Sequence, residues 1–327
     1  MGAWGPGLYA NDFASDLKGT VGVLARLPLP AERLLEMLVE AAPAQANNPD
    51  DEEHTTFWLV AADQFARKGV DCPAAREKAL SLIASGADLA AMATLEMDEK
   101  SLKKRAAMLE ALRMELSTPM GSRPRKVLKT PEKLLFEVGE ALAYPVGTNP
   151  HKLPGLAGPP NPWARDPIDP YGAGSKTLKD RPYYAAWRQD GWGAMVIAER
   201  GHLFDYLAWY RPMVVNRPLV DEPALADLLA ARDWLLRKPG VLTARHRDLL
   251  QIKSVGRVAL DRAKWAAKIP EKLSMQSLLI TFGSTLHGKM ATMGLPEETL
   301  RHPSAGWETE FSHIESLQAV AADQLRA

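Results

Sequence analysis

The chain of 327 residues is long enough for two ordinary domains, and its 46% apolar residues suffice for globular cores. Its 40 basic and 40 acidic residues cancel, which disfavours a general nucleic-acid binder but leaves a local basic patch open. The single cysteine, Cys72, excludes an internal disulfide framework, and no apolar run approaches the roughly 20 residues that span a bilayer. With no leader pattern at the N-terminus, we expect a cytoplasmic protein that does not enter a membrane.

Charge is distributed unevenly along the chain. Residues 1–116 carry 12 basic against 18 acidic residues, and the remainder carries 28 against 22. This contrast favours a domain boundary near residue 117 and electrostatic attraction between the two halves.

The chain opens with MGAWGPGLYANDFASD, where glycines form a turn around a large ring and a polar pair can cap a helix. The motif consists of Trp4, Gly5, Gly7, Asn11, Asp12 and Asp16, with an aromatic residue at Tyr9. This pattern resembles the start of a bacterial family of uncharacterised proteins, domain of unknown function family 4259. The resemblance implies a small helical domain packed around Trp4, in which the motif residues are structural.

Apolar residues at helical spacing predict five helices in this first part of the chain. The first carries Leu17, Val21 and Leu24, and the others lie around residues 34–42, 57–69, 73–86 and 102–116. Residues 1–116 are therefore predicted to form one α-helical domain. The acids at residues 50–53 follow one another directly, which is more typical of a solvated loop than of acid–base chemistry.

Residues 117–131 combine three prolines and a glycine with basic side chains. Such a segment cannot sustain a helix, so we expect an exposed linker. Arg123, Arg125, Lys126 and Lys129 could contact phosphate, but the segment has no aromatic platform for nucleic acid and a solvated connector is favoured.

The aromatic stretch at residues 183–215 organises the second domain, predicted over residues 132–270. Asp190-Gly191 and Arg200-Gly201 are hairpin signals that divide it into three antiparallel strands. The middle strand is apolar on both faces, so the sheet should be covered on both sides. A further strand is predicted within residues 134–146, with a bend or bulge at Gly139.

A proline- and glycine-rich insertion at residues 145–182 separates these strands, with Trp163 and Tyr171 as candidate anchors. The order of elements also resembles the small β domain that follows the helical domain in some longer relatives. That second resemblance implies a small curved sheet or partial barrel.

The region after the sheet mixes helical and ambiguous patterns. Residues 221–236 predict a helix, and Thr243 can cap another. Residues 246–269 and 274–290 fit helix or strand. Residues 271–327 are treated as a C-terminal accessory segment, and the predicted fold class is α+β: an N-terminal helical domain, then a small antiparallel sheet or partial barrel with C-terminal helices.

Neither a metal site nor a cofactor site is predicted. The seven histidines lack metal-ligand spacing, although a tertiary site from His202, His246 and Asp205 stays open. Nucleotide-binding and hydrolase motifs are also missing, and Gly283-Ser284-Thr285 is not a phosphate loop.

Two functions are compatible with these observations. The favoured one is a bacterial protein-interaction module, an immunity, antitoxin or defence component that binds a partner protein. Its candidate binding residues are Trp163, Trp187, Trp192, Trp209, Tyr210 and Arg211, because aromatic and arginine side chains dominate interface hot spots. The alternative is an enzyme or nucleic-acid-processing factor with a site between the domains, built from His202, Arg211 and Arg245.

Overall fold

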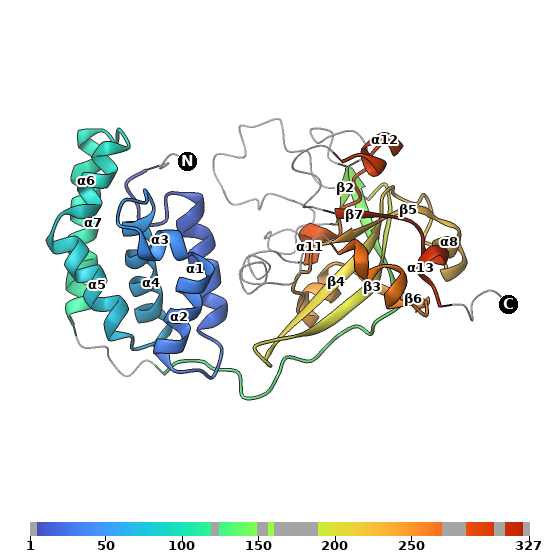
Figure 1. Cartoon of the computed structure of the whole chain (residues 1–327), viewed down its shortest axis with the longest axis horizontal. Coiled ribbons are helices and arrows are strands. Elements are labelled where there is room, and N and C mark those ends of the chain that lie inside the picture. The colour runs from blue at the N-terminus through green and yellow to red at the C-terminus, as the bar shows by residue number, and fades with distance from the viewer. Residues whose placement is uncertain are drawn as a thin grey trace. The chain divides into compact units, whose positions relative to one another are not determined.

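The computed structural model of the chain describes residues 5–118, 124–148, 156–159, 189–269, 286–303 and 311–322. Within these ranges the residues up to Thr130 form one compact unit and those from Pro131 onward form another (Figure 1). The first unit is helical and the second is built on a curled antiparallel sheet, a half-barrel, which confirms the α+β class. Among the described residues, no helix is both long enough and apolar enough to cross a membrane.

The helical unit contains the five predicted helices and two short ones that the pattern did not reveal. In chain order they are α1 (Asp12–Leu24), α2 (Ala31–Ala41), α3 (Pro43–Asn47), α4 (His54–Lys68), α5 (Pro73–Ala84), α6 (Ala87–Thr94) and α7 (Glu99–Ser117). Helices α3 and α6 span only 5 and 8 residues and are rich in alanine. Such short runs carry too few large apolar residues to display a helical period.

Helix α4 is the centre of this unit. Its residues from His54 to Phe65 are buried apart from Trp58, so both apolar and polar positions of the helix face neighbours. Leu17, Val21 and Leu24 of α1 are buried, as predicted, and burial of such a side chain contributes roughly 2 kcal/mol. Helix α4 ends where Gly69 adopts a left-handed conformation that glycine tolerates without strain.

The segment after α7 differs from the expected solvated connector at Arg125. Its guanidinium donates hydrogen bonds to three backbone carbonyls in the turn after α1, those of Ala25 (2.9 Å), Leu29 (2.7 Å) and Leu27. The backbone nitrogen of Leu128 also donates to the carbonyl of Arg26 at 2.7 Å. These bonds attach residues 125–128 to the helical unit, because they satisfy backbone carbonyls of the turn after α1.

The second unit is organised by an antiparallel sheet (Figure 1). Along the sheet the strands lie in the order β2-β1-β3-β4-β5-β7, and β6 also pairs with β1. The strands are β1 (Glu140–Thr148), β2 (Ala157–Gly158), β3 (Gly191–Leu203), β4 (Leu207–Val215), β5 (Arg232–Arg237), β6 (Lys253–Arg257) and β7 (Phe311–Ser316).

Strands β3 and β4 form one long hairpin, so the predicted turn at Arg200-Gly201 is wrong. Gly201 lies inside the ladder opposite Trp209, and the chain reverses after Leu203. Phe204 and Asp205 take positive φ angles of 50° and 63° and make the turn. Gly201 instead leaves room for the Trp209 ring of the opposite strand, because a Cβ at residue 201 would lie 3.2 Å from that ring.

Two other boundaries also differ from the sequence-based expectation. Strand β1 begins at Glu140 rather than near residue 134, because Gly139 has a φ of 80° that ends the extended run. The predicted helix over residues 221–236 is only α8 (Leu225–Ala230), and the following residues Arg232–Arg237 form β5. A strand in the centre of the sheet buries Trp234, Leu235 and Leu236 more completely than a surface helix could.

The regions whose pattern fits either helix or strand contain both kinds of element. Thr243 does cap a helix, α9 (Ala244–Leu249), by accepting a hydrogen bond from the backbone nitrogen of His246. Strand β6 follows it, and then two short 3₁₀ turns, η1 (Arg262–Lys264) and η2 (Ala266–Lys268). Among the described residues after these turns, the helices are α11 (Leu286–Lys289), α12 (Glu297–Arg301) and α13 (Leu317–Val320). Most of residues 274–290 lie outside the described part of the chain.

The sheet is covered on both faces, as its two-sided apolar pattern predicts. Ala194 and Val196 of β3 pack in one core with Trp265 and with Leu317 of α13. Their neighbours Met195 and Ile197 point to the other core, which includes Leu250, Leu286 and Met290. The described C-terminal residues belong to this architecture, since β7 pairs with β5 along the sheet.

Candidate functional site

The polar residues of the opening motif are tied to α4. The Tyr9 hydroxyl donates to the Asp63 carboxylate and accepts a hydrogen bond from the Gln64 amide. Arg67 donates to both carboxylate oxygens of Asp63 at 2.8 Å, and Lys18 lies 4.8 Å from the centre of the Tyr9 ring. Burial raises the pKa of the Tyr9 hydroxyl. This cluster therefore holds α1 against α4 with a neutral phenol and a paired carboxylate.

Asn11 links the same two helices one turn away. Its side-chain oxygen caps α1 by accepting a bond of 2.7 Å from the Ala14 nitrogen, and its amide donates to Glu53 at 3.0 Å. Burial raises the pKa of the Glu53 carboxyl, while the bond from Asn11 acts in the opposite direction. Asp12 and Asp16 are exposed, and Trp4 lies outside the described residues.

A buried ion pair joins α6 to α7 and to the opening motif. Arg105 and Asp88 are only 3% and 0% exposed, and their two bonds measure 2.5 and 2.8 Å. Thr55 of α4 donates to the same carboxylate at 3.1 Å, and Arg105 also donates to the carbonyl of Gly7 at 3.3 Å. Every strong polar group here has a partner, so the arrangement supports the fold rather than a reaction.

Sequence reasoning singled out the motif residues but missed their partners. Glu53, Asp63 and Arg105 lie 42 to 98 positions away from the residues of the opening that they bond. A charged residue on an otherwise apolar helix face was the one available signal, as at Asp63 in VAADQF.

The candidate binding residues of the sheet are placed in different environments. Trp192 and Trp209 are partly exposed, with Lys253 lying 5.1 Å from the centre of the Trp192 ring. Tyr210 is fully buried and accepts a hydrogen bond of 2.6 Å from the Leu135 nitrogen. Arg211 is buried too and pairs with Glu199 at 3.0 Å. Trp163 and Trp187 lie outside the described residues.

The polar residues considered for an enzyme or a metal site have separate partners or none in common. His202 bonds the carbonyl of Glu132 at 2.7 Å, Arg211 bonds Glu199, and Arg245 is exposed on α9. Burial lowers the pKa of His246. In the described ranges, no group of three or more His, Cys, Asp and Glu residues could hold a metal ion.

A surface groove of about 430 Å³ lies in the helical unit between α2 and the start of α5. Its apolar lining comes from Leu35 and Val39 of α2 and from Cys72, Pro73 and Ala74. Leu35 and Val39 are partly exposed, whereas Leu34 and Leu38, on the inner side of the same helix, are 0% exposed. Helix α2 therefore has a second apolar strip that the described residues of the unit cover only in part. We call this feature the α2–α5 groove.

The rim of the α2–α5 groove is acidic. Glu32, Glu36 and Glu40 follow one another at one-turn intervals along α2, and no basic residue is among the described residues that line the groove. Arg33 bonds both Glu36 (2.9 Å) and Glu40 (3.0 Å), so one cation is shared by two carboxylates. These four residues carry a net charge of −2, from three acids and one base.

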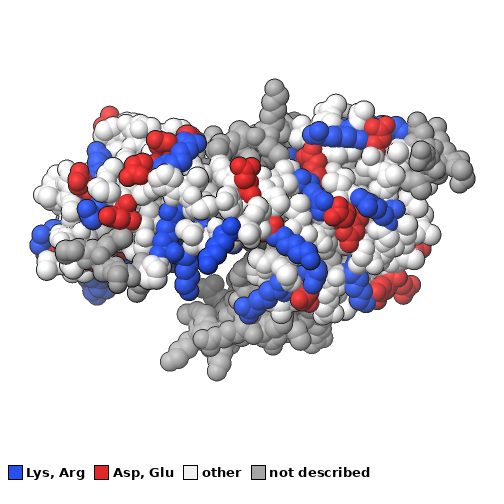
Figure 2. All heavy atoms as spheres, turned by 90° about the horizontal axis from the view of Figure 1, so that it is seen from below, with Lys and Arg blue, Asp and Glu red and all other residues white. Residues whose placement is uncertain are grey.

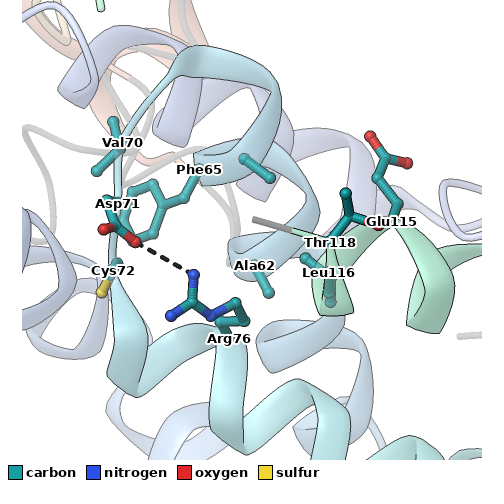
Figure 3. Close-up of a pocket in the computed structure, with 10 residues that line it drawn as sticks. Ala62, Phe65, Val70, Asp71, Cys72, Arg76, Glu115, Leu116 and Thr118 are labelled. Atoms are coloured by element: carbon teal, nitrogen blue, oxygen red, sulfur yellow. Dashed lines mark hydrogen bonds and ion pairs between the residues drawn. The ribbon is translucent and has the colours of Figure 1, made fainter. Parts of the chain in front are cut away.

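Cys72 lies between the groove and a second, much smaller cavity of about 20 Å³ (Figure 3). Figure 3 shows Asp71 and Arg76 facing each other on this side, where their ion pair measures 3.3 Å. The cavity has room for about one water molecule, which is too little for a ligand. Burial raises the pKa of the Cys72 thiol, with Glu32 and Asp71 acting in the same direction, so the thiol is not activated as a nucleophile.

Charge is mixed on the face of the molecule that Figure 2 draws. Lys and Arg side chains lie together with Asp and Glu side chains on both units there.

Fold and site together define an α+β protein whose helical unit carries an apolar groove with an acidic rim. Comparison of the chain with family models, with curated proteins and with solved structures gives no match.

Proposed function

We propose that this protein acts by binding a second protein, as an immunity, antitoxin or defence component. The observation that carries the proposal is the partly exposed apolar strip of α2, formed by Leu35 and Val39 in the α2–α5 groove. An apolar hollow with a polar rim is the usual anatomy of a protein-binding surface.

The lining of the groove favours a protein over a small polar ligand. Sites for small molecules orient their ligands with several converging donors and acceptors. Here the polar side chains are three carboxylates on one edge, and the rest of the lining is aliphatic apart from Cys72. Such a surface favours a partner whose shape and charge match the groove along α2, rather than a ligand with one particular functional group.

The sheet unit offers a second, smaller contact. We propose that the partly exposed rings of Trp192 and Trp209 add to recognition, since tryptophan is enriched in interface hot spots. Tyr210 and Arg211 would act behind them as buried supports, because both side chains are occupied by contacts within the unit.

The test is capture of the partner by the tagged full chain in its host of origin, followed by quantitative mass spectrometry. Replacing Val39 with aspartate places a charge on the groove floor and should reduce the recovered partner about tenfold or more, since a buried unpaired charge is costly. Val220→Asp is the matched control, because it introduces the same charge at a valine that is 86% exposed and does not line the groove.

Both variants should keep the thermal unfolding midpoint of the unmodified chain. A partner that is recovered equally with Val39→Asp and with Val220→Asp would move recognition away from the groove. Partner recovery with Trp209→Ala, measured in parallel, then tests whether this partly exposed tryptophan of the sheet contributes to recognition.

A further inference from the structure

The three rim carboxylates have the spacing of a helix. Glu32, Glu36 and Glu40 lie at positions i, i+4 and i+8 of α2, so successive side chains rise by about 6 Å along one edge. A second helix running alongside would present its own residues at i, i+4 and i+8 with the same rise. Carboxylates at this interval are matched by Lys or Arg residues on such a helix.

The apolar floor has the same geometry. Leu35 and Val39 are also four residues apart, next to the acidic edge, and Pro73 and Ala74 form the opposite wall. Side chains one turn apart on an amphipathic helix would enter this hollow while their charged neighbours meet the rim. Helices bind in grooves of this kind through anchors at i and i+4.

The acidic edge is not neutralised from within. Glu36 and Glu40 share the single guanidinium of Arg33, and Glu32 takes no part in that ion pair. Glu32 nevertheless lies close enough to the floor to raise the pKa of the Cys72 thiol. An incoming cation would therefore meet a carboxylate at the end of the groove nearest the start of α2.

We infer that the α2–α5 groove receives one amphipathic helix of the partner protein, with two apolar anchors on one face and Lys or Arg residues one turn apart beside them. This inference rests on the proposed function and specifies the chemistry of the partner. The complementary charges set orientation and association rate, and the apolar anchors supply most of the affinity.

The experiment uses the full chain and two fluorescent synthetic peptides of about 18 residues, or five helical turns. Both peptides carry two leucines, four residues apart, along one face. On the edge beside the leucines, the first peptide has three lysines at intervals of four residues, and the second has glutamates in place of those lysines. Fluorescence anisotropy measures each dissociation constant, and we expect the basic peptide to bind at least about tenfold more tightly.

Raising the salt concentration from about 50 mM to about 500 mM should weaken binding of the basic peptide, because the rim charges are exposed and screened. Glu32→Lys should lower the affinity for the basic peptide about tenfold and leave the Arg33 ion pairs intact. The substitution removes one of three attractions between peptide lysines and rim carboxylates and replaces it with a repulsion. Asp50→Lys changes the total charge equally and should leave the affinity unchanged. A peptide with one lysine exchanged for glutamate should recover binding to Glu32→Lys.

Equal binding of the basic and acidic peptides, or equal losses in Glu32→Lys and Asp50→Lys, would overturn the inference. Failure here is separable from failure of the proposed function. If Val39→Asp releases the cellular partner while the basic peptide does not bind, the groove binds a protein but not a basic helix. If the basic peptide binds through Glu32 while recovery of no cellular partner depends on Val39, the proposed function is wrong. The inference that the groove binds a basic amphipathic helix is then supported by the peptide alone.

Discussion

Arg105 shows how a single side chain joins distant parts of the helical unit. Through one guanidinium it contacts Asp88 of α6 and the carbonyl of Gly7, while Thr55 of α4 completes the shell of the carboxylate. Gly7 is therefore held through its backbone carbonyl, in addition to the side-chain bonds of Tyr9 and Asn11 in the same opening.

Removing one partner of this ion pair should destabilise the helical unit strongly. Arg105→Met leaves the Asp88 carboxylate buried without its cation, and the expected cost is about 3–5 kcal/mol in the free energy of unfolding. Denaturant titration followed by helical circular dichroism measures it. Lys103→Met on the same helix is the control, because Lys103 and its partner Glu99 are exposed and their pair contributes little.

The double variant Asp88→Leu with Arg105→Met makes the comparison sharper. It removes both charges, so it should cost much less than the two single replacements added together. Additive costs would show that the two groups do not act as a pair.

At the scale of elements, β1 depends on the backbone conformation of Gly139. Its nitrogen donates to the carbonyl of Ile197, and its carbonyl accepts from the nitrogen of Val258, so the residue joins β3 to the chain after β6. A Cβ at this position would lie 2.1 Å from the Val258 oxygen, on a residue whose φ is already 80°. Only glycine can occupy this crossing without displacing the backbone.

Gly139→Ala should therefore destabilise the sheet unit by roughly 2 kcal/mol or more, through strain at positive φ and the clash with Val258. Gly288→Ala in α11 is the matched substitution, because a Cβ there meets nothing within 4 Å. It should be neutral or slightly stabilising. Thermal unfolding monitored by tryptophan fluorescence distinguishes the two, and equal midpoints would show that the crossing at Gly139 relaxes freely.

At the scale of the whole molecule, the described chain divides between Thr130 and Pro131. The residues just before this division are bonded to the helical unit through Arg125 and Leu128, whereas Lys126 and Lys129 are exposed. A protease needs an extended and accessible backbone around the cleaved bond. The bonds of Arg125 thus decide which basic residues of this segment are accessible.

Limited trypsin digestion should cut first after Lys126 or Lys129 and more slowly after Arg125, giving a helical and a sheet fragment. Arg125→Gln removes the guanidinium that spans three carbonyls and should increase the initial rate of cutting at Lys126. Mass spectrometry of a time course identifies the sites. First cuts within α1–α7 would mean that the helical unit opens before this segment does.

Local pattern was sufficient for the long helices, because Leu17, Val21 and Leu24, or Phe57, Val60 and Phe65, repeat at the period of the helix they form. It was also sufficient for the two-sided burial of the first half of β3, where residues 192–198 carry no polar side chain on either face. These properties depend on the order of neighbouring residues alone. The same reasoning predicted the cap at Thr243 from one polar side chain ahead of a helix.

The remaining features depend on residues that are far apart in the chain. Arg200-Gly201 has the composition of a turn, yet Gly201 stays in the ladder because the Trp209 ring needs the space above it. Residues 232–237 leave the helical pattern because pairing with β4 and β7 buries Trp234 completely. The α2–α5 groove arises because the α4–α5 loop brings Cys72 and Pro73 beside α2, which neither segment encodes by itself. Long-range packing thus overrides local preference wherever a buried face or a close backbone contact is at stake.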